Sequence, residues 1–120
     1  VIPNTVPDRC GEVVLTTEFV DGAPLSSIEN ADVETRDRVG EIIYRFYQGA
    51  LYRDAAFNGD PHPGNIRLLD DGRVAFLDFG MFKTMDRRAV DAEAHLLDLA
   101  AARDAEGVLD LLRSYGVARA

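Results

Sequence analysis

Three side chains near the middle of the chain have the types and the spacing that phosphoryl transfer requires. Asp60 is followed five residues later by Asn65, and thirteen residues further on Asp78 opens the triplet Asp-Phe-Gly. A transferring phosphoryl group carries charge that must be neutralised, and the hard Mg²⁺ ion prefers oxygen ligands from a few carboxylates or amides. An acid facing the nucleophile, with an amide and a second acid holding the metal, would supply that chemistry.

The order of these residues is that of protein-kinase-like enzymes, in which Asp-x-x-x-x-Asn precedes Asp-Phe-Gly. In that order Asp60 would orient or deprotonate the acceptor hydroxyl or a water, whereas Asn65 and Asp78 would be the metal ligands. His62 lies two residues after Asp60, between two prolines. It could donate to the γ-phosphate, with a charge that changes near neutral pH, or it could lock the loop by bonding to the backbone. The sequence leaves both roles open, and we keep His62 with Asp60 as a catalytic candidate.

The residues around this motif narrow the class further. DPHPGN at 60–65, preceded by Phe-Asn-Gly and followed by IRLLDDGRVAFLDFGM, resembles the ABC1 family of atypical kinases, also called the UbiB or ADCK family. The resemblance covers most of the chain, from about Val13 to Gly116. It implies a protein-kinase-like fold, ATP and Mg²⁺ as cofactors, and an atypical kinase or ATPase activity linked to quinone or lipid metabolism.

One departure from the family pattern keeps two alternatives open. The family usually reads His-Ala-Asp before Pro-His-Pro, whereas this chain has Asn58-Gly59-Asp60, which is closer to the His-Gly-Asp of aminoglycoside and choline kinases. The first alternative is therefore a small-molecule phosphotransferase of that kind. The second is a non-catalytic nucleotide-binding module, which should have lost its metal ligands.

The segment after Asp-Phe-Gly argues against a typical protein kinase. No Ala-Pro-Glu follows, and a helical pattern resumes within about six residues of Gly80, so there is little room for a peptide-docking platform. The expected substrate is a small molecule or a lipid, or the activity is ATP hydrolysis coupled to work on a lipid or a partner.

Composition excludes several other classes of protein. The chain carries 21 acidic against 13 basic residues, for a formal charge of −8, which disfavours nucleic acid and anionic membrane surfaces as partners. Cys10 is the single cysteine, so there is no disulfide framework, and no apolar run is long enough to span a bilayer. We expect a cytoplasmic location, with membrane association only through parts of the parent protein outside this chain.

Two kinase parts have no counterpart in these 120 residues. The ten glycines never fall as Gly-x-Gly, and the single lysine, Lys83, follows Asp-Phe-Gly instead of preceding the catalytic loop. We therefore expect an N-terminal lobe that is largely absent here and belongs to the same parent protein. Without that lobe the chain should bind ATP weakly and should not turn it over.

Residues 13–20 (VVLTTEFV) are β-branched and apolar and end at a turn signal, Asp21-Gly22, so the pattern predicts a strand. The resemblance implies that this is the last strand of the N-terminal lobe. That lobe would end at residue 22, where the strand leads into the hinge between the lobes. Glu18 and Val20 would then offer backbone groups to an adenine ring. An ordinary edge strand is the other interpretation.

The remaining pattern predicts an α+β fold, the mainly helical C-terminal lobe of a protein-kinase-like domain, over residues 23–120. An apolar stripe predicts a long helix over 32–52, capped by Asn30 or Asp32. A catalytic loop over 57–65 precedes an Asp-Phe-Gly-containing hairpin over 66–80, whose short strands 66–69 and 74–77 are joined by a Gly-containing turn. Helices follow within 84–116, the first ending near 102 and the second covering about 105–115.

Overall fold

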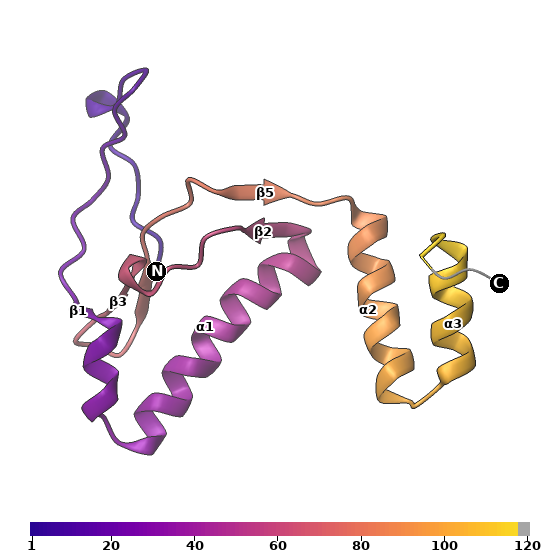
Figure 1. Ribbon diagram of the computed structural model, residues 1–120. Coiled ribbons are helices and arrows are strands. Elements are labelled where there is room, and N and C mark those ends of the chain that lie inside the picture. Colours follow the sequence, from indigo (N-terminus) through magenta and orange to yellow (C-terminus); the bar gives the residue numbers. More distant parts are fainter. Residues whose placement is uncertain (118–120) are drawn as a thin grey trace. The chain divides into compact units, whose positions relative to one another are not determined.

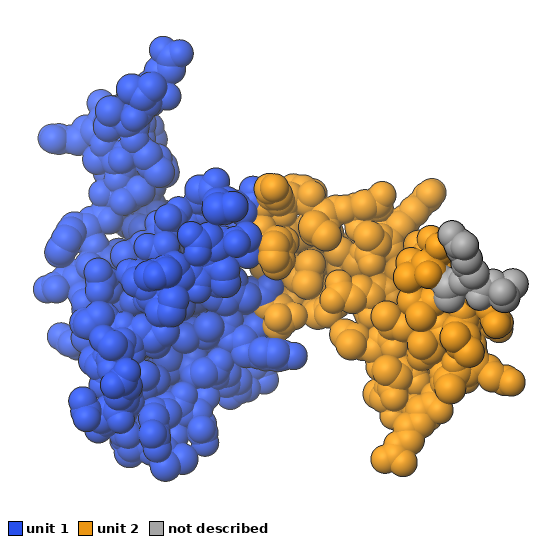
Figure 2. All heavy atoms as spheres, in the orientation of Figure 1, with its two compact units in different colours: residues 1–47, 58–82 blue, residues 48–57, 83–120 orange. Residues whose placement is uncertain are grey.

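The computed structural model describes residues 1–117 and shows a mixed α+β fold (Figure 1). The chain divides into two compact units, distinguished by colour in Figure 2. Unit 1 contains residues 1–47 and 58–82, and unit 2 contains residues 48–57 and those from 83 onward. Every residue singled out above for catalysis, metal binding or nucleotide binding lies in unit 1, so this unit is described first.

Unit 1 is built on a small antiparallel sheet with strand order β1-β3-β4. The strands are β1 (Ala23–Pro24), β3 (Ile66–Leu68) and β4 (Val74–Phe76). Three 3₁₀ helices, η1 (Pro7–Arg9), η2 (Leu25–Asn30) and η3 (Pro63–Asn65), and the first part of helix α1 (Val33–Asp54) complete the unit.

The predicted hairpin is confirmed, and turn chemistry explains its register. β3 and β4 pair with Ile66 opposite Phe76 and Leu68 opposite Val74. The turn between them places Gly72 at φ +81°, a left-handed conformation that favours glycine. This register ends β4 two residues before Asp78, next to the loop that carries Asp60.

The long helix is also confirmed, with bounds shifted by one or two residues. Of the two proposed caps, Asp32 is the one used, because its Oδ1 accepts the backbone N–H of Thr35 at 2.7 Å. The apolar stripe packs on the sheet: Val39 is buried with Ile66, Val74 and Phe76 in one core cluster. Further along the same face are half-buried side chains packed against that cluster, namely Ile42, Ile43, Phe46 and Tyr47.

The predicted strand over 13–20 is wrong. The structure has only isolated bridges there, Thr5 with Thr17 and Gly11 with Val14, within the extended arm drawn in indigo in Figure 1. Val13 is 94% exposed and Phe19 is 92% exposed. A β-branched run becomes a regular strand only where a neighbour supplies a continuous ladder. Here the pairing stops after single bridges, so propensity alone does not produce a strand.

Gly22 shows how closely β3 approaches the segment before β1. A Cβ added at Gly22 would lie 2.9 Å from the carbonyl oxygen of Leu68 and 3.1 Å from the Cβ of Arg67. Since backbone atoms cannot give way cheaply, we expect Gly22→Ala to lower the free energy of unfolding by about 1–3 kcal/mol. Urea unfolding followed by circular dichroism would measure this. Gly11→Ala is the matched control, because a Cβ there meets nothing within 4 Å; equal midpoints for both variants would contradict this packing.

Unit 2 contains the helical end of the chain. Helix α2 (Arg87–Ala101) is capped by Asp86, and helix α3 (Ala105–Ser114) by Asp104, each through a side-chain oxygen that accepts a first-turn N–H. Gly116, at φ +70°, follows the end of α3. Both helices were predicted and are confirmed, and the Asp104 cap and the glycine after α3 follow the usual rules for helix ends.

Two short strands, β2 (Ala56–Asn58) and β5 (Phe82–Thr84), pair as a second small sheet that the sequence did not predict. The predicted loop over 57–65 is therefore strand in its first two residues. Three-residue strands carry too short an alternation to be recognised from sequence.

Candidate active site

The loop at 60–65 is held in shape by its own histidine. The Nδ1 atom of His62 accepts the backbone N–H of Gly64 at 3.0 Å, and the His62 carbonyl oxygen accepts the N–H of Asn65 at 3.0 Å. A Cβ at Gly64 would lie 2.9 Å from that Nδ1, so a larger residue at this position would have to displace the ring. Because Nδ1 accepts, the neutral ring carries its proton on Nε2. The ring thus locks the loop and retains a donor on its other nitrogen.

Asn65 and Asp78, the two proposed metal ligands, lie in contact. The Nδ2 of Asn65 donates to Oδ2 of Asp78 at 3.3 Å, and the backbone N–H of Gly80 donates to Oδ1 of Asp78 at 2.7 Å. The two segments are also joined by their backbones, since the N–H of Leu77 donates to the carbonyl oxygen of Asn65 at 2.9 Å. The hairpin β3–β4 therefore delivers both side chains to one point.

This pair fits Mg²⁺ in donor chemistry. Asp78 is exposed and Asn65 half-buried, and each Asp78 oxygen accepts a single N–H bond and retains lone-pair capacity. Within residues 1–117 no group of three or more His, Cys, Asp or Glu side chains could hold a metal ion. One carboxylate and one amide, completed by phosphates and waters, is a usual set for Mg²⁺, which seldom occupies an all-protein cage.

Asp60 is exposed, and its backbone is tied to the segment that carries Asp78. Its N–H donates to Oδ1 of Asn58 at 3.0 Å, and the Nδ2 of Asn58 donates to the carbonyl oxygen of Asp78 at 3.3 Å. Gly59 adds a backbone bond to the carbonyl oxygen of Met81 at 3.0 Å. The structure thus brings Asp60, Asn65 and Asp78 together within one network.

Asn58 had no role in the sequence analysis beyond its place in the motif. Its i to i+2 bond to the N–H of Asp60 is an Asx turn, which an Asn two residues before a loop acid can form. This local hydrogen bond could have been predicted from the sequence. The bond to Asp78, twenty residues away, could not.

Tyr47 is a second residue whose relation to the site emerges only in three dimensions. Burial, and then the negative charge of Asp60, raise the pKa of the Tyr47 phenol. The ring packs edge-on against Phe76, with centroids 5.6 Å apart. Tyr47 belongs to the apolar stripe of α1 that packs against the core cluster, and the same side chain is close enough to Asp60 to be affected by its charge.

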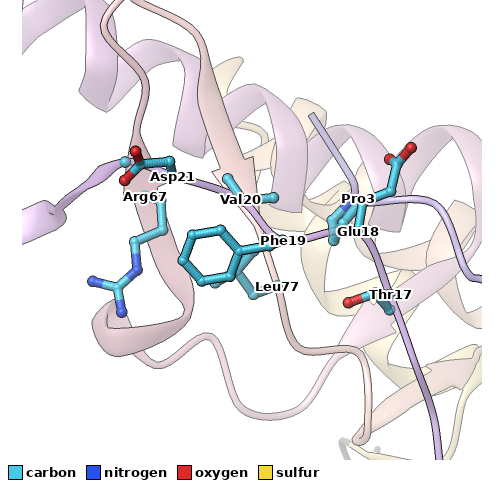
Figure 3. Close-up of a pocket in the computed structure, with 9 residues that line it drawn as sticks. Pro3, Thr17, Glu18, Phe19, Val20, Asp21, Arg67 and Leu77 are labelled. Atoms are coloured by element: carbon cyan, nitrogen blue, oxygen red, sulfur yellow. The ribbon is translucent and has the colours of Figure 1, made fainter.

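Figure 3 shows the residues that line a cavity of about 500 Å³. Its lining comes from the 17–22 segment, from β3 and from Leu77, the residue before Asp78. Glu18 and Val20, the proposed adenine-binding positions, both line it. The backbone N–H of Glu18 is already donated to the carbonyl oxygen of Asn4 at 2.9 Å, and its carboxylate accepts the side-chain amide of Asn4. Arg67 also lines the cavity and was not anticipated.

With this geometry in place, comparison with known proteins establishes the class. The ABC1 atypical kinase-like domain matches residues 1–112, and the chain belongs to this family. Protein ACTIVITY OF BC1 COMPLEX KINASE 1, chloroplastic, of Arabidopsis thaliana is 30% identical over 81% of the chain. An uncharacterized protein of Synechocystis, slr0889, is 32% identical over 97% of the chain. The predicted family is confirmed.

A solved structure agrees with the fold. Rv3197 of Mycobacterium tuberculosis, solved in complex with erythromycin, superposes with a TM-score of 0.75 at 26% identity, over 93% of this chain and 28% of that one. The chain spans 31% of the Synechocystis relative and 15% of the Arabidopsis relative, so the relatives are much longer proteins. Among the described residues, no helix combines the length and the apolar character needed to cross a membrane.

Proposed function

We propose that this chain is the C-terminal-lobe portion of an ABC1-type atypical kinase or ATPase that binds ATP and Mg²⁺. The contact between Asn65 and Asp78 is the observation that carries the proposal, because it gathers a carboxylate and an amide beside a cavity. Leu77 lines that cavity and directly precedes Asp78. A nucleotide with its base against Val20 and Leu77 would direct its phosphates toward the metal ligands.

Each residue then has a separate task. Bound Mg²⁺ would neutralise charge on the phosphates. Asp78 and Asn65 hold it through oxygen atoms, and Asp60 orients the acceptor hydroxyl or a water and takes its proton. His62 keeps the loop rigid through Nδ1 and has its Nε2 proton available for a phosphate oxygen. Tight backbone bonding around these side chains suits a reaction in which positioning supplies much of the acceleration.

We propose a small molecule or a lipid as the substrate, with a link to quinone or lipid metabolism, or ATP hydrolysis coupled to such work. The short passage between Asp-Phe-Gly and the start of α2 at Arg87 favours this over a peptide substrate. Regions of the parent protein outside this chain would supply the phosphate-covering loop and the strand lysine. Location in the cytoplasm, with membrane association through such regions, belongs to the same proposal.

A second candidate is small-molecule binding without turnover. It is favoured by the structural similarity to Rv3197, which was solved in complex with erythromycin. Measurement of ATP turnover separates the two functions, because a binding module would hold a ligand without Mg²⁺-dependent hydrolysis or transfer.

We expect Asp78→Asn in the full-length protein to remove the Mg²⁺-dependent part of ATP binding while leaving the fold intact. A neutral amide has nearly the same shape as the carboxylate but is a poorer ligand for Mg²⁺. The loss should reach at least about tenfold in nucleotide affinity when Mg²⁺ is present, or roughly 1.4 kcal/mol. Calorimetric titration of ATP, with and without Mg²⁺, measures it.

Asp70→Asn is the matched control, because Asp70 is an exposed aspartate at the opposite end of the same hairpin. It should bind ATP·Mg²⁺ as the wild type does. If Mg²⁺ strengthened ATP binding to Asp78→Asn as much as to the wild type, Asp78 would not be a metal ligand and the proposed site would be wrong.

A further inference from the structure

Asn58 is the one polar residue among the buried residues of the described chain. It ends strand β2 and is 7% exposed. A buried amide is stable in a protein when its donors and acceptors are used. Both ends of this amide are bonded, the oxygen to the N–H of Asp60 at 3.0 Å and the nitrogen to the carbonyl oxygen of Asp78 at 3.3 Å.

The orientation of this amide follows from its partners. A backbone N–H can only donate and a backbone carbonyl can only accept. The oxygen of Asn58 must therefore face Asp60, and its nitrogen must face Asp78; the flipped amide would break both bonds. The side chain thus joins the backbones of two acids whose carboxylates have different proposed tasks.

We propose that Asn58 is a positioning residue that holds the nucleophile-facing Asp60 in register with the metal-binding Asp78. This inference rests on the function proposed above for those two acids. Asp60 is on an exposed loop, and its N–H is held by Asn58 alone among the hydrogen bonds of the described residues. The neighbouring hydrogen bond from the N–H of Gly59 to the carbonyl oxygen of Met81 joins the two chain segments, but it involves neither Asp60 nor Asp78. Without Asn58, the loop acid would shift relative to the metal ligand, and a shift of about 1 Å can cost roughly 10²-fold in rate.

Two substitutions separate positioning from simple packing. Asn58→Leu keeps the volume and removes both bonds. Asn58→Asp keeps the shape and the acceptor for the N–H of Asp60, but an ionised carboxylate cannot donate to the carbonyl oxygen of Asp78.

The test measures ATP turnover of the full-length protein at saturating ATP·Mg²⁺ for the wild type, Asn58→Asp and Asn58→Leu. Asn30→Asp and Asn30→Leu are matched controls at an exposed asparagine. Asn58→Leu should lower kcat by roughly 10- to 100-fold with a smaller change in KM. Asn58→Asp, which keeps the bond to Asp60 and loses the bond to Asp78, should also lower kcat with a smaller change in KM. An unchanged kcat in Asn58→Asp overturns the proposal, and that variant decides the matter if Asn58→Leu does not fold.

A second measurement needs no catalysis and so separates this inference from the proposed function. Hydrogen exchange of the Asp60 amide, followed by NMR on the 120-residue chain, should be at least about tenfold faster in Asn58→Leu and nearly unchanged in Asn58→Asp. Unchanged exchange in a folded Asn58→Leu overturns the bridge itself. If the wild type shows no turnover while exchange behaves as expected, the bridge stands, and both the proposed function and the catalytic part of this inference fail.

Discussion

Asp60→Asn is expected to lower turnover by roughly 10²- to 10⁴-fold, the usual range for a positioned acid–base group. The substitution removes the proton acceptor that Asp60 would offer to the attacking hydroxyl or water, while its amide keeps nearly the same shape. The backbone N–H of Asp60, which is bonded to Asn58, is untouched. The change should therefore act on the chemical step without moving the loop.

Affinity for ATP·Mg²⁺ should remain close to that of the wild type in this variant, because the interaction matters chiefly in the transition state. Nucleotide affinity and the single-turnover rate, both measured on the full-length protein, test the expected loss of turnover and the expected unchanged binding. Asp37→Asn, an exposed aspartate on α1, is the control and should alter neither quantity.

The contrast with Asp78→Asn makes this test specific. If Asp60→Asn abolished nucleotide binding and Asp78→Asn spared it, the two roles would be reversed. If neither substitution affected binding or turnover, this network would not be a phosphoryl-transfer site, and binding without turnover would replace the proposed function.

Phe76→Ala is expected to lower the free energy of unfolding of unit 1 by about 3–5 kcal/mol, through lost apolar burial and the cavity left behind. Phe76 is 3% exposed, and its ring stacks on that of Phe46 with centroids 3.7 Å apart and planes 8° from parallel. It also lies two residues before Asp78, so the same packing that stabilises α1 on the sheet supports the end of β4.

Chemical denaturation followed by near-ultraviolet circular dichroism would measure this loss. Tyr44→Ala removes an aromatic ring that is 67% exposed on α1 and should cost less than about 1 kcal/mol. Phe76→Leu retains much of the volume and should fall between the two, which keeps the comparison informative if Phe76→Ala does not fold. Equal midpoints for Phe76→Leu and Tyr44→Ala would contradict the assigned core.

Local sequence was sufficient wherever a short-range rule decides the structure. The stripe of α1 follows from helical periodicity, and the caps Asp32, Asp86 and Asp104 follow from the needs of first-turn N–H groups. The β3–β4 hairpin follows from two short apolar runs around a Gly-containing turn. The family likewise follows from one contiguous stretch, because its motif holds residue types that phosphoryl transfer needs in a set order.

Strand propensity was an insufficient guide where a strand needs a pairing partner from a distant part of the chain. Residues 13–20 have strand-forming side chains but no continuous ladder beside them, so the segment stays an extended arm, and its residues 17–20 line a cavity. The β2–β5 pairing was missed for the converse reason, since each strand is too short to be seen without the other.

The sequence by itself therefore determined the family, most of the elements and the order of the candidate residues Asp60, Asn65 and Asp78. Only the tertiary structure decided how those residues are held. Asn58 donates to the carbonyl oxygen of Asp78, twenty positions away in the sequence. In addition to burial, the negative charge of Asp60 contributes to the raised pKa of Tyr47 on α1. These contacts join residues that are far apart in the sequence, and they form only because α1 packs on β3 and β4. The residue pattern of one segment alone therefore cannot predict them.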